Sequence, residues 1–162
     1  WFADQAIKLA DSASSLKDLS KLYVMKGIGY YYQGKNKKAV NCFHASVNYA
    51  KQSDYDKILG NALTMLSLVH RNLGNYDSAV YYGKQSLKIR TDKVHDSADI
   101  GGSYDNLATI YQQIGNYEAS IDYSLKAEKI FSKLNNLKEL AYVYGNLSNL
   151  YELVQDRKNH LR

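Results

Sequence analysis

The sequence predicts an all-α fold built from repeated helical hairpins, and three observations support this class. Apolar residues recur at helical spacing, and no window of the 162 residues shows the period-two alternation of a half-buried strand. The chain contains no proline, the strongest helix breaker, whereas proteins use about 5% on average. Similar segments also recur at a regular interval of about 40 residues, which is typical of arrays whose units pack on their neighbours.

The repeat is clearest at three turns. Gly34, Gly74 and Gly115 follow one another at this regular interval. Five positions past each glycine comes a small residue, and the next position is β-branched and apolar. These positions are Ala39, Ala79 and Ser120, followed by Val40, Val80 and Ile121. Because glycine accepts the positive φ that reverses the chain where a helix ends, each unit is predicted to be a hairpin that turns at its glycine.

Aligned on these turns, the units resemble the tetratricopeptide repeat family, whose pattern runs W-x₂-L-G-x₂-Y, then A-x₃-F, then P. Two segments fit the first half with Tyr for Trp, two fit it partly, and Ala39-x₃-Phe43 fits the second half. The four first-half segments are Tyr104-x₂-Leu107-Ala108-x₂-Tyr111, Tyr144-x₂-Leu147-Ser148-x₂-Tyr151, Tyr23-x₂-Lys26-Gly27-x₂-Tyr30 and Leu63-x₂-Leu66-Ser67-x₂-His70. The final Pro is missing, and the units are longer than those usual for the family. Such long units resemble those of kinesin light chains, Pins-type scaffolds and bacterial signalling proteins.

The expected architecture is a single array of about eight helices over residues 1–162. Its parts are the second helix of a partial repeat (1–14), three repeats (15–53, 54–94 and 95–135) and the first helix of a truncated repeat (136–162). We expect the helices at 3–12, 16–33, 36–52, 56–73, 76–92, 97–114, 117–134 and 138–154, with residues 157–162 starting another. The resemblance implies a right-handed α-solenoid whose first helices line a concave groove. Without an initiator Met or a capping repeat, the sequence is expected to be excised from a larger protein.

Composition excludes several classes of protein. The single cysteine, Cys42, excludes an internal disulfide framework and a multi-Cys zinc site. No apolar run approaches the ~18 residues of a membrane span, so we expect a soluble segment, cytoplasmic or periplasmic. The net charge of +5 is mild and its charges are interspersed, which indicates a solvated basic surface with a weak preference for acidic partners. Direct nucleic-acid binding is not predicted, because most tyrosines recur at packing positions.

Catalysis is not predicted for this segment. Its four histidines, His44, His70, His95 and His160, are scattered over different units. The sequence contains no H-E-x-x-H, no G-x-S-x-G and no phosphate-binding glycine loop. No metal ligand and no cofactor are expected. His70 takes the position that Tyr111 holds in the next unit, so it is expected to be a packed core residue.

The remaining chemistry is protein recognition. The resemblance implies that the face of the first helices opposite their packing stripe looks into the groove. This face changes from apolar and aromatic in the N-terminal half to amide-rich in the C-terminal half. The residues expected to bind a peptide are Met25, Tyr31, Tyr32, Met65, Leu68, Arg71, Asn72, Asp105, Asn106, Gln112, Gln113, Tyr142, Asn146 and Asn149. Val24, Asn61 and Thr64 are expected on the same face.

Asn106 and Asn146 are the expected readers of peptide backbone. They stand at equivalent positions in successive units, and each amide carries one donor group and one acceptor group. The resemblance implies that successive groove asparagines hold an extended peptide. The alternative is a hydrogen bond between adjacent helices.

The clamp by which chaperone-docking members of the family hold a terminal carboxylate is not expected. In those members Lys, Asn, Asn, Lys and Arg lie on three successive first helices. Here the first positions hold Val24, Ile28 and Met65, and further along only amides survive.

We therefore predict a non-enzymatic protein-interaction module that binds a peptide segment or a partner protein in its groove. The resemblance implies the input or scaffold region of a bacterial signalling or transcription-regulatory protein. The alternative is a structural or oligomerising segment that packs against its own parent protein or self-associates through exposed array ends. An enzyme fused elsewhere would place catalysis outside these residues.

Overall fold

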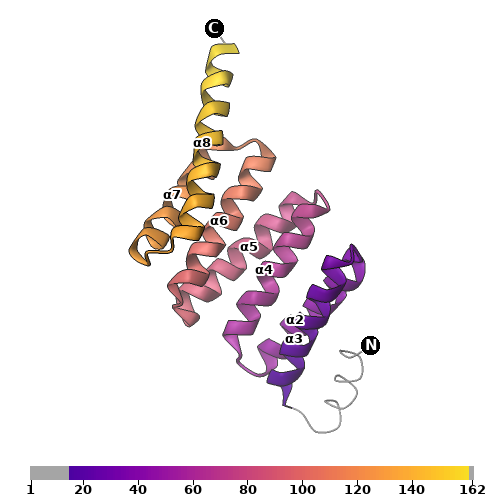
Figure 1. Cartoon of the computed structure of the whole chain (residues 1–162). Coiled ribbons are helices and arrows are strands. Elements are labelled where there is room, and N and C mark those ends of the chain that lie inside the picture. The colour runs from indigo at the N-terminus through magenta and orange to yellow at the C-terminus, as the bar shows by residue number, and fades with distance from the viewer. Residues whose placement is uncertain (1–14, 161–162) are drawn as a thin grey trace. The chain divides into compact units, whose positions relative to one another are not determined.

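The computed structural model describes residues 15–160, and their side chains to residue 155, so the helix expected at 3–12 lies outside the described residues. Within this range the chain is all-α and has no strand, which confirms the predicted fold class. Sequential helices pack as antiparallel pairs (Figure 1). The elements are α2 (Leu16–Tyr32), α3 (Asn36–Gln52), α4 (Asp56–Asn72), α5 (Tyr76–Ile89), the π-helical segment η1 (Arg90–Val94), α6 (Ser97–Ile114), α7 (Tyr117–Lys133) and α8 (Leu137–His160).

The helices form two compact units that meet in sequence between Val94 and His95, at a predicted boundary between repeats. Unit 1 contains α2 to α5 and η1. Each helix there packs on the next, and α2 also contacts α4. In unit 2, α6 packs on α7 and α7 packs on α8.

The turns inside the hairpins lie at the three predicted glycines. Gly34, Gly74 and Gly115 have φ values of +70°, +74° and +82°. At each turn the glycine amide donates to the carbonyl three residues back, and the next amide donates to the carbonyl five residues back, with N···O distances of 2.9–3.0 Å. These bonds satisfy carbonyls that the ends of the first helices leave open, so the turn glycines have the predicted role.

The turns between hairpins use a second set of residues, which sequence analysis did not identify. Asp54, His95 and Asn135 have positive φ values of 49°, 56° and 50°. They occupy the same position in successive repeats. Asp, His and Asn are the non-glycine residues that adopt this region most readily, which explains why the positions tolerate three different side chains.

Two helix ends differ from the expectation. The second helix of the 54–94 repeat ends as an α-helix at Ile89 and continues to Val94 in the wider π form. The last helix was expected to end near 154, with residues 157–162 starting a partner, and this expectation is wrong because α8 runs unbroken through His160. The position equivalent to Gly115 in the last repeat is Gln155, so the glycine that ends the other first helices is absent.

The buried clusters lie between the second helix of one repeat and the first helix of the next, that is, between α3 and α4 and between α7 and α8. In unit 1, Phe43 and Leu66 are fully buried in a cluster with Ala39 and Val69, while Ala50, Leu59 and Leu63 form a second cluster. In unit 2 the buried cluster consists of Ala127, Phe131, Val143 and Leu147. Burying one such Phe or Leu side chain stabilises the fold by about 1.5–3 kcal/mol, so these clusters hold successive repeats against one another.

Buried serines link the helices of each pair. In unit 1, the Oγ of Ser46 donates to the Ser20 carbonyl and the Oγ of Ser86 donates to the Gly60 carbonyl, both at 2.8 Å. These hydroxyls occupy equivalent positions in successive repeats and reach across to a first helix. The small serine side chains let the two helices approach closely, and the bonds to the carbonyls satisfy the buried hydroxyl groups.

Candidate functional site

The predicted recognition residues of unit 1 lie on α2 and α4, two helices that contact each other. We call this surface the α2–α4 face. It consists of Lys21, Met25, Ile28, Tyr31, Tyr32, Met65, Leu68, Arg71 and Asn72.

The α2–α4 face is apolar at its centre, and its side chains range from partly buried to exposed. Met25 and Tyr32 are 67% and 82% exposed. Ile28, Tyr31 and Met65 are partly buried and pack against the cluster that contains Phe43 and Leu66. Leu68 is half-buried. The core thus fixes the inner side chains from behind and leaves outer ones available for contact.

A polar link joins the two helices of this face. The Nδ2 of Asn72 donates to the Oη of Tyr31 at 2.6 Å, between residues on equivalent helices of successive repeats. Tyr31 also packs edge-on against Tyr32, with ring centroids 5.6 Å apart. Sequence analysis placed all three residues at the site but did not predict their contact.

Arg71 lies beside this link in the last turn of α4. The residue is half-buried, and its Nε atom is buried with no hydrogen-bond partner. Within the described part of the chain, no carboxylate forms an ion pair with it. Its position at a helix C-terminus is favourable for a positive charge.

Three residues expected on the recognition face pack inside the fold instead. Val24 is 8% exposed. Asn61 accepts a hydrogen bond from Nη2 of Arg90 at 2.9 Å. Thr64 donates to the Gly60 carbonyl at 3.1 Å, and its hydroxyl lies 2.8 Å from the hydroxyl of Ser86. The expectation was wrong for Val24, which is buried on α2. Asn61 and Thr64 are half-buried, because α5 and η1 also pack on α4.

In unit 2 the predicted residues lie on α6 and α8, and both helices pack on α7. Gln113, Tyr142 and Asn149 are exposed, with Tyr142 at 60%, while Asp105, Gln112 and Asn146 are half-buried.

The two predicted backbone readers differ in exposure. Asn106 is only 7% exposed and is engaged in interactions inside the fold. Asn146 is half-buried. Peptide binding by Asn106 and Asn146 and the alternative, a hydrogen bond between adjacent helices, both stay predictions.

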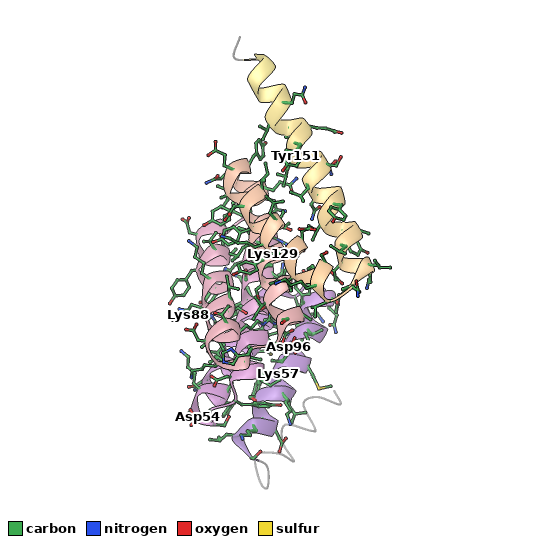
Figure 2. All side chains as sticks on the ribbon, turned by 90° about the vertical axis from the view of Figure 1, so that its left-hand side faces the viewer. Asp54, Lys57, Lys88, Asp96, Lys129 and Tyr151 are labelled. Atoms are coloured by element: carbon green, nitrogen blue, oxygen red, sulfur yellow. The ribbon has the colours of Figure 1, made fainter. Side chains whose placement is uncertain are left out.

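The tyrosines at the packing positions of α8 are exposed to solvent. Tyr144 and Tyr151 are each 53% exposed. Figure 2 shows Tyr151 on α8. The equivalent residues on α6, Tyr104 and Tyr111, lie 6.1 and 5.4 Å from the ring of Tyr123 on α7. The Oη of Tyr144 donates to Glu128 at 3.0 Å, and this bond raises the pKa of Tyr144.

The structure brings together two histidines that the sequence analysis described as scattered. The ring of His70 stacks on Tyr82 at 5.4 Å, and the ring of His44 meets Tyr82 edge-on at 5.9 Å. Nδ1 of His70 is buried without a hydrogen-bond partner. Burial, together with the charge of nearby His44, lowers the pKa of His70. His70 was expected to be a packed core residue; it packs against Tyr82 but is half-buried, at the edge of the core.

Charge is unevenly divided between the units. Residues 15–94 contain 13 Lys and Arg and five Asp and Glu, a formal net charge of +8. Residues 95–160 contain six and nine, a net charge of −3. The expectation of interspersed charges was therefore wrong at the scale of the units. Lys57 and Lys88, both exposed, belong to the basic unit (Figure 2).

Neither a metal centre nor a membrane-spanning helix is found in the described residues. No group of three His, Cys, Asp or Glu side chains there is arranged to hold a metal ion. None of the helices in this range combines the length and the apolar character that crossing a bilayer requires.

Comparison with protein families gives matches over most of the chain. Two family profiles, both described as tetratricopeptide repeat, match residues 18–92 and 101–137. No curated protein matches the sequence.

Solved structures resemble the chain over nearly its whole length. BtubC (BKLC) from P. vanneervenii is 21% identical with a TM-score of 0.80, and the match covers 95% of this chain and 63% of BtubC. Aspartyl phosphate phosphatase F from Bacillus subtilis is 17% identical with a TM-score of 0.86, covering 98% and 42%. A Rap protein complexed with Competence and Sporulation Factor is 11% identical with a TM-score of 0.81, covering 98% and 44%. The chain spans less than two thirds of each of these proteins, and at these identities the likeness concerns the fold.

Proposed function

Because the chain belongs to the tetratricopeptide repeat family, we propose that it binds a peptide segment or a partner protein on its α2–α4 face. Helical repeats of this kind are protein-interaction modules that present extended binding surfaces. The observation that carries the proposal is the exposure of Met25 and Tyr32 beside the partly buried Tyr31 and Met65. Contiguous apolar surface of this sort is a mark of interaction sites.

The finer part of the proposal concerns the parent protein. We propose that the segment is an input or scaffold region of a bacterial signalling or transcription-regulatory protein, working in an aqueous compartment. The likeness to a Rap protein that was solved with Competence and Sporulation Factor supports this assignment. We further propose that the segment performs no catalysis of its own, since the family is a binding fold and its reactive side chains take part in packing, as His70 does.

Selection of peptides from a random dodecapeptide display library tests the proposal. The wild-type chain is expected to enrich specific sequences, and Met25→Ala with Tyr32→Ala is expected to abolish their binding at unchanged melting temperature. The matched control is Tyr81→Ala, since Tyr81 is 57% exposed on α5, outside the face. Loss of binding in the control alone, or no enrichment by the wild type, would contradict the proposal.

A second candidate function, self-association, has one observation in its favour. Tyr144 and Tyr151 of α8 are exposed at positions whose counterparts on α6 contact a second helix. A second copy of the chain is one occupant for this surface. Sedimentation equilibrium of the wild type and of Ser148→Lys, a change between the two tyrosines, separates a dimer from a monomer.

A further inference from the structure

Of the two cationic residues on the α2–α4 face, Lys21 pairs with Asp18 at 3.3 Å, whereas no carboxylate of the described residues pairs with Arg71. Its Nε is buried with no hydrogen-bond partner. The Nε of Arg90, the other arginine of unit 1, is buried without a hydrogen-bond partner as well, but its Nη2 donates to the side chain of Asn61 at 2.9 Å. A buried charged donor without an acceptor is unfavourable, and natural structures keep few such groups unless a ligand or another partner uses them.

Neither α2 nor α4, the two helices of the face, supplies a carboxylate to Arg71. α2 and α4 contain one acidic residue each, Asp18 and Asp56. Both lie in the first turn of their helix, and each pairs with a lysine, at 3.3 and 3.1 Å. Arg71 lies in the last turn of α4, which is about 22 Å from Asp56 along the helix axis.

The side chains next to Arg71 are suited to a peptide. Leu68 and Met65 supply apolar surface one and two turns earlier on the same helix. The bond between Asn72 and Tyr31 holds the adjacent polar groups in place. A methionine side chain adapts its shape to different apolar partners, so this part of the face accepts varied residues while the guanidinium position is fixed.

Net charge points to the same ligand chemistry. The described part of unit 1 carries a formal charge of +8, against −3 for that of unit 2. Such a field favours the approach of an acidic partner and raises its association rate.

From these observations we propose that Arg71 binds the side-chain carboxylate of an acidic residue in a peptide held on the α2–α4 face. The proposal rests on the proposed function and adds the chemistry of the ligand. A planar guanidinium forms two parallel hydrogen bonds with one carboxylate, an arrangement that a lysine cannot reproduce. Unit 1 therefore selects peptides that combine acidic and apolar residues. A side chain, not a chain terminus, is the expected source, because the cationic clamp positions hold Val24, Ile28 and Met65.

The display library described above tests the selection. Peptides enriched by the wild type are expected to be rich in Asp and Glu together with apolar residues. Arg71→Gln is expected to lose the acidic preference and to keep the apolar one. The matched control is Lys51→Gln, which removes the same charge from an exposed residue at the end of α3 and is expected to keep both preferences.

A double-mutant cycle on the best peptide, synthesised with an amidated C-terminus, tests the contact itself. Arg71→Gln in the chain and Glu→Gln in the peptide are each expected to weaken binding about tenfold or more, and together no further. Arg71→Lys is expected to restore only part of the affinity. Melting curves of each variant show whether the fold is intact.

Several results would overturn the inference. Enrichment of peptides without acidic residues would refute it while leaving the proposed function in place, and a failure to enrich any peptide would refute both. Equal losses in Lys51→Gln and Arg71→Gln would show a general charge effect. Additive losses in the cycle, binding only of peptides with a free C-terminus, or Arg71-dependent binding of a mixed-sequence oligonucleotide at physiological salt would each assign Arg71 another role.

Discussion

The hairpin α4–α5 in unit 1 and the hairpin α6–α7 in unit 2 have the same backbone plan and fill three equivalent positions differently. In the first hairpin the Oγ of Ser67 donates to the Ala79 carbonyl at 2.8 Å. In the second the roles are exchanged, and the Oγ of Ser120 donates to the Ala108 carbonyl at 2.8 Å. Residues 67 and 108, and 79 and 120, are equivalent. In these two hairpins the contact therefore pairs one serine with one alanine, and either helix supplies the hydroxyl.

At the second position a large side chain of the second helix packs against a glycine of the first helix, and this side chain is aromatic in one hairpin and charged in the other. Gly101 lies against the ring of Phe131, and the equivalent Gly60 lies against the side chain of Arg90. Both large residues are buried, at 3% and 6% exposure. The glycine in the first helix makes room for either, and Arg90 satisfies part of its polar group through Asn61.

The third position is a ring pair. Tyr111 stacks on Tyr123 in unit 2 with centroids 5.4 Å apart and planes inclined by 9°. In unit 1, His70 stacks on Tyr82 at the same 5.4 Å with planes inclined by 22°. The comparison teaches that the repeat conserves contact geometry within this chain, while the chemical type of each partner changes.

The largest effect is expected where a glycine touches an aromatic ring. A Cβ at residue 101 would lie 2.8 Å from Phe131, so Gly101→Ala should destabilise unit 2 by ~1–3 kcal/mol in chemical denaturation. Gly60→Ala should cost less, because its closest neighbour is Cγ of the flexible Arg90 at 3.3 Å. Gly102→Ala is the control: nothing lies within 4 Å of its Cβ, and it should stabilise by ~0.5–1 kcal/mol. Equal effects at residues 60 and 101 would contradict the comparison.

The turn glycines test what the two hairpins share. Gly74 and Gly115 have φ values of +74° and +82°, which a Cβ disfavours. Gly74→Ala and Gly115→Ala should each destabilise by ~1 kcal/mol. Gly29→Ala serves as the control, because Gly29 lies inside α2 with open space around its Cβ and should gain stability. A gain at residue 74 or 115 would show that the turn can relax out of the left-handed region.

These comparisons also show how far the sequence predicts the structure. The regular repeat spacing identified the helix pairs and the glycine turns, because glycine and apolar periodicity act locally. The turns at Asp54, His95 and Asn135 were missed because their shared property is tolerance of positive φ, not a shared residue type. The end of α8 was missed because it depends on an absent glycine at position 155.

The candidate site was predicted less completely. The resemblance to the repeat family implied that Met25, Tyr32 and Arg71 lie on one face, and the structure leaves the first two exposed. Spacing could not show that Thr64 bonds to α5, or that Asn106 is buried, since both depend on which neighbouring helix covers each turn. Counting charges by repeat would have revealed the basic unit from sequence alone.

The exchanged serine tests whether the hydroxyl contact is interchangeable. Ser67→Ala removes the bond to the Ala79 carbonyl and should destabilise unit 1 by ~0.5–1.5 kcal/mol. Adding Ala79→Ser recreates the arrangement of Ala108 and Ser120, so the double variant should regain most of the loss in urea denaturation. A double variant less stable than Ser67→Ala would show that the two hairpins are not equivalent at this contact.

The smallest effect on stability is expected from the ring pair of His70 and Tyr82, and this effect depends on pH. Burial lowers the pKa of His70 below its usual 6.5, so the folded state holds this proton less tightly than the unfolded state. The contribution of neutral His70 to the stability of the fold is therefore complete above about pH 6.5. It decreases as the pH falls through that value toward the lowered pKa of the folded state. Amide hydrogen exchange measures this loss of stability in unit 1. The protection of α4 amides is compared between pH 7.5 and pH 5.0, with the α6 amides of the same chain as the reference. His70→Tyr recreates the pair of Tyr111 and Tyr123 and should remove most of the difference, whereas His44→Gln should remove a smaller part, because the charge of His44 is the lesser cause. An α4 response to pH that persists in His70→Tyr would show that another group titrates.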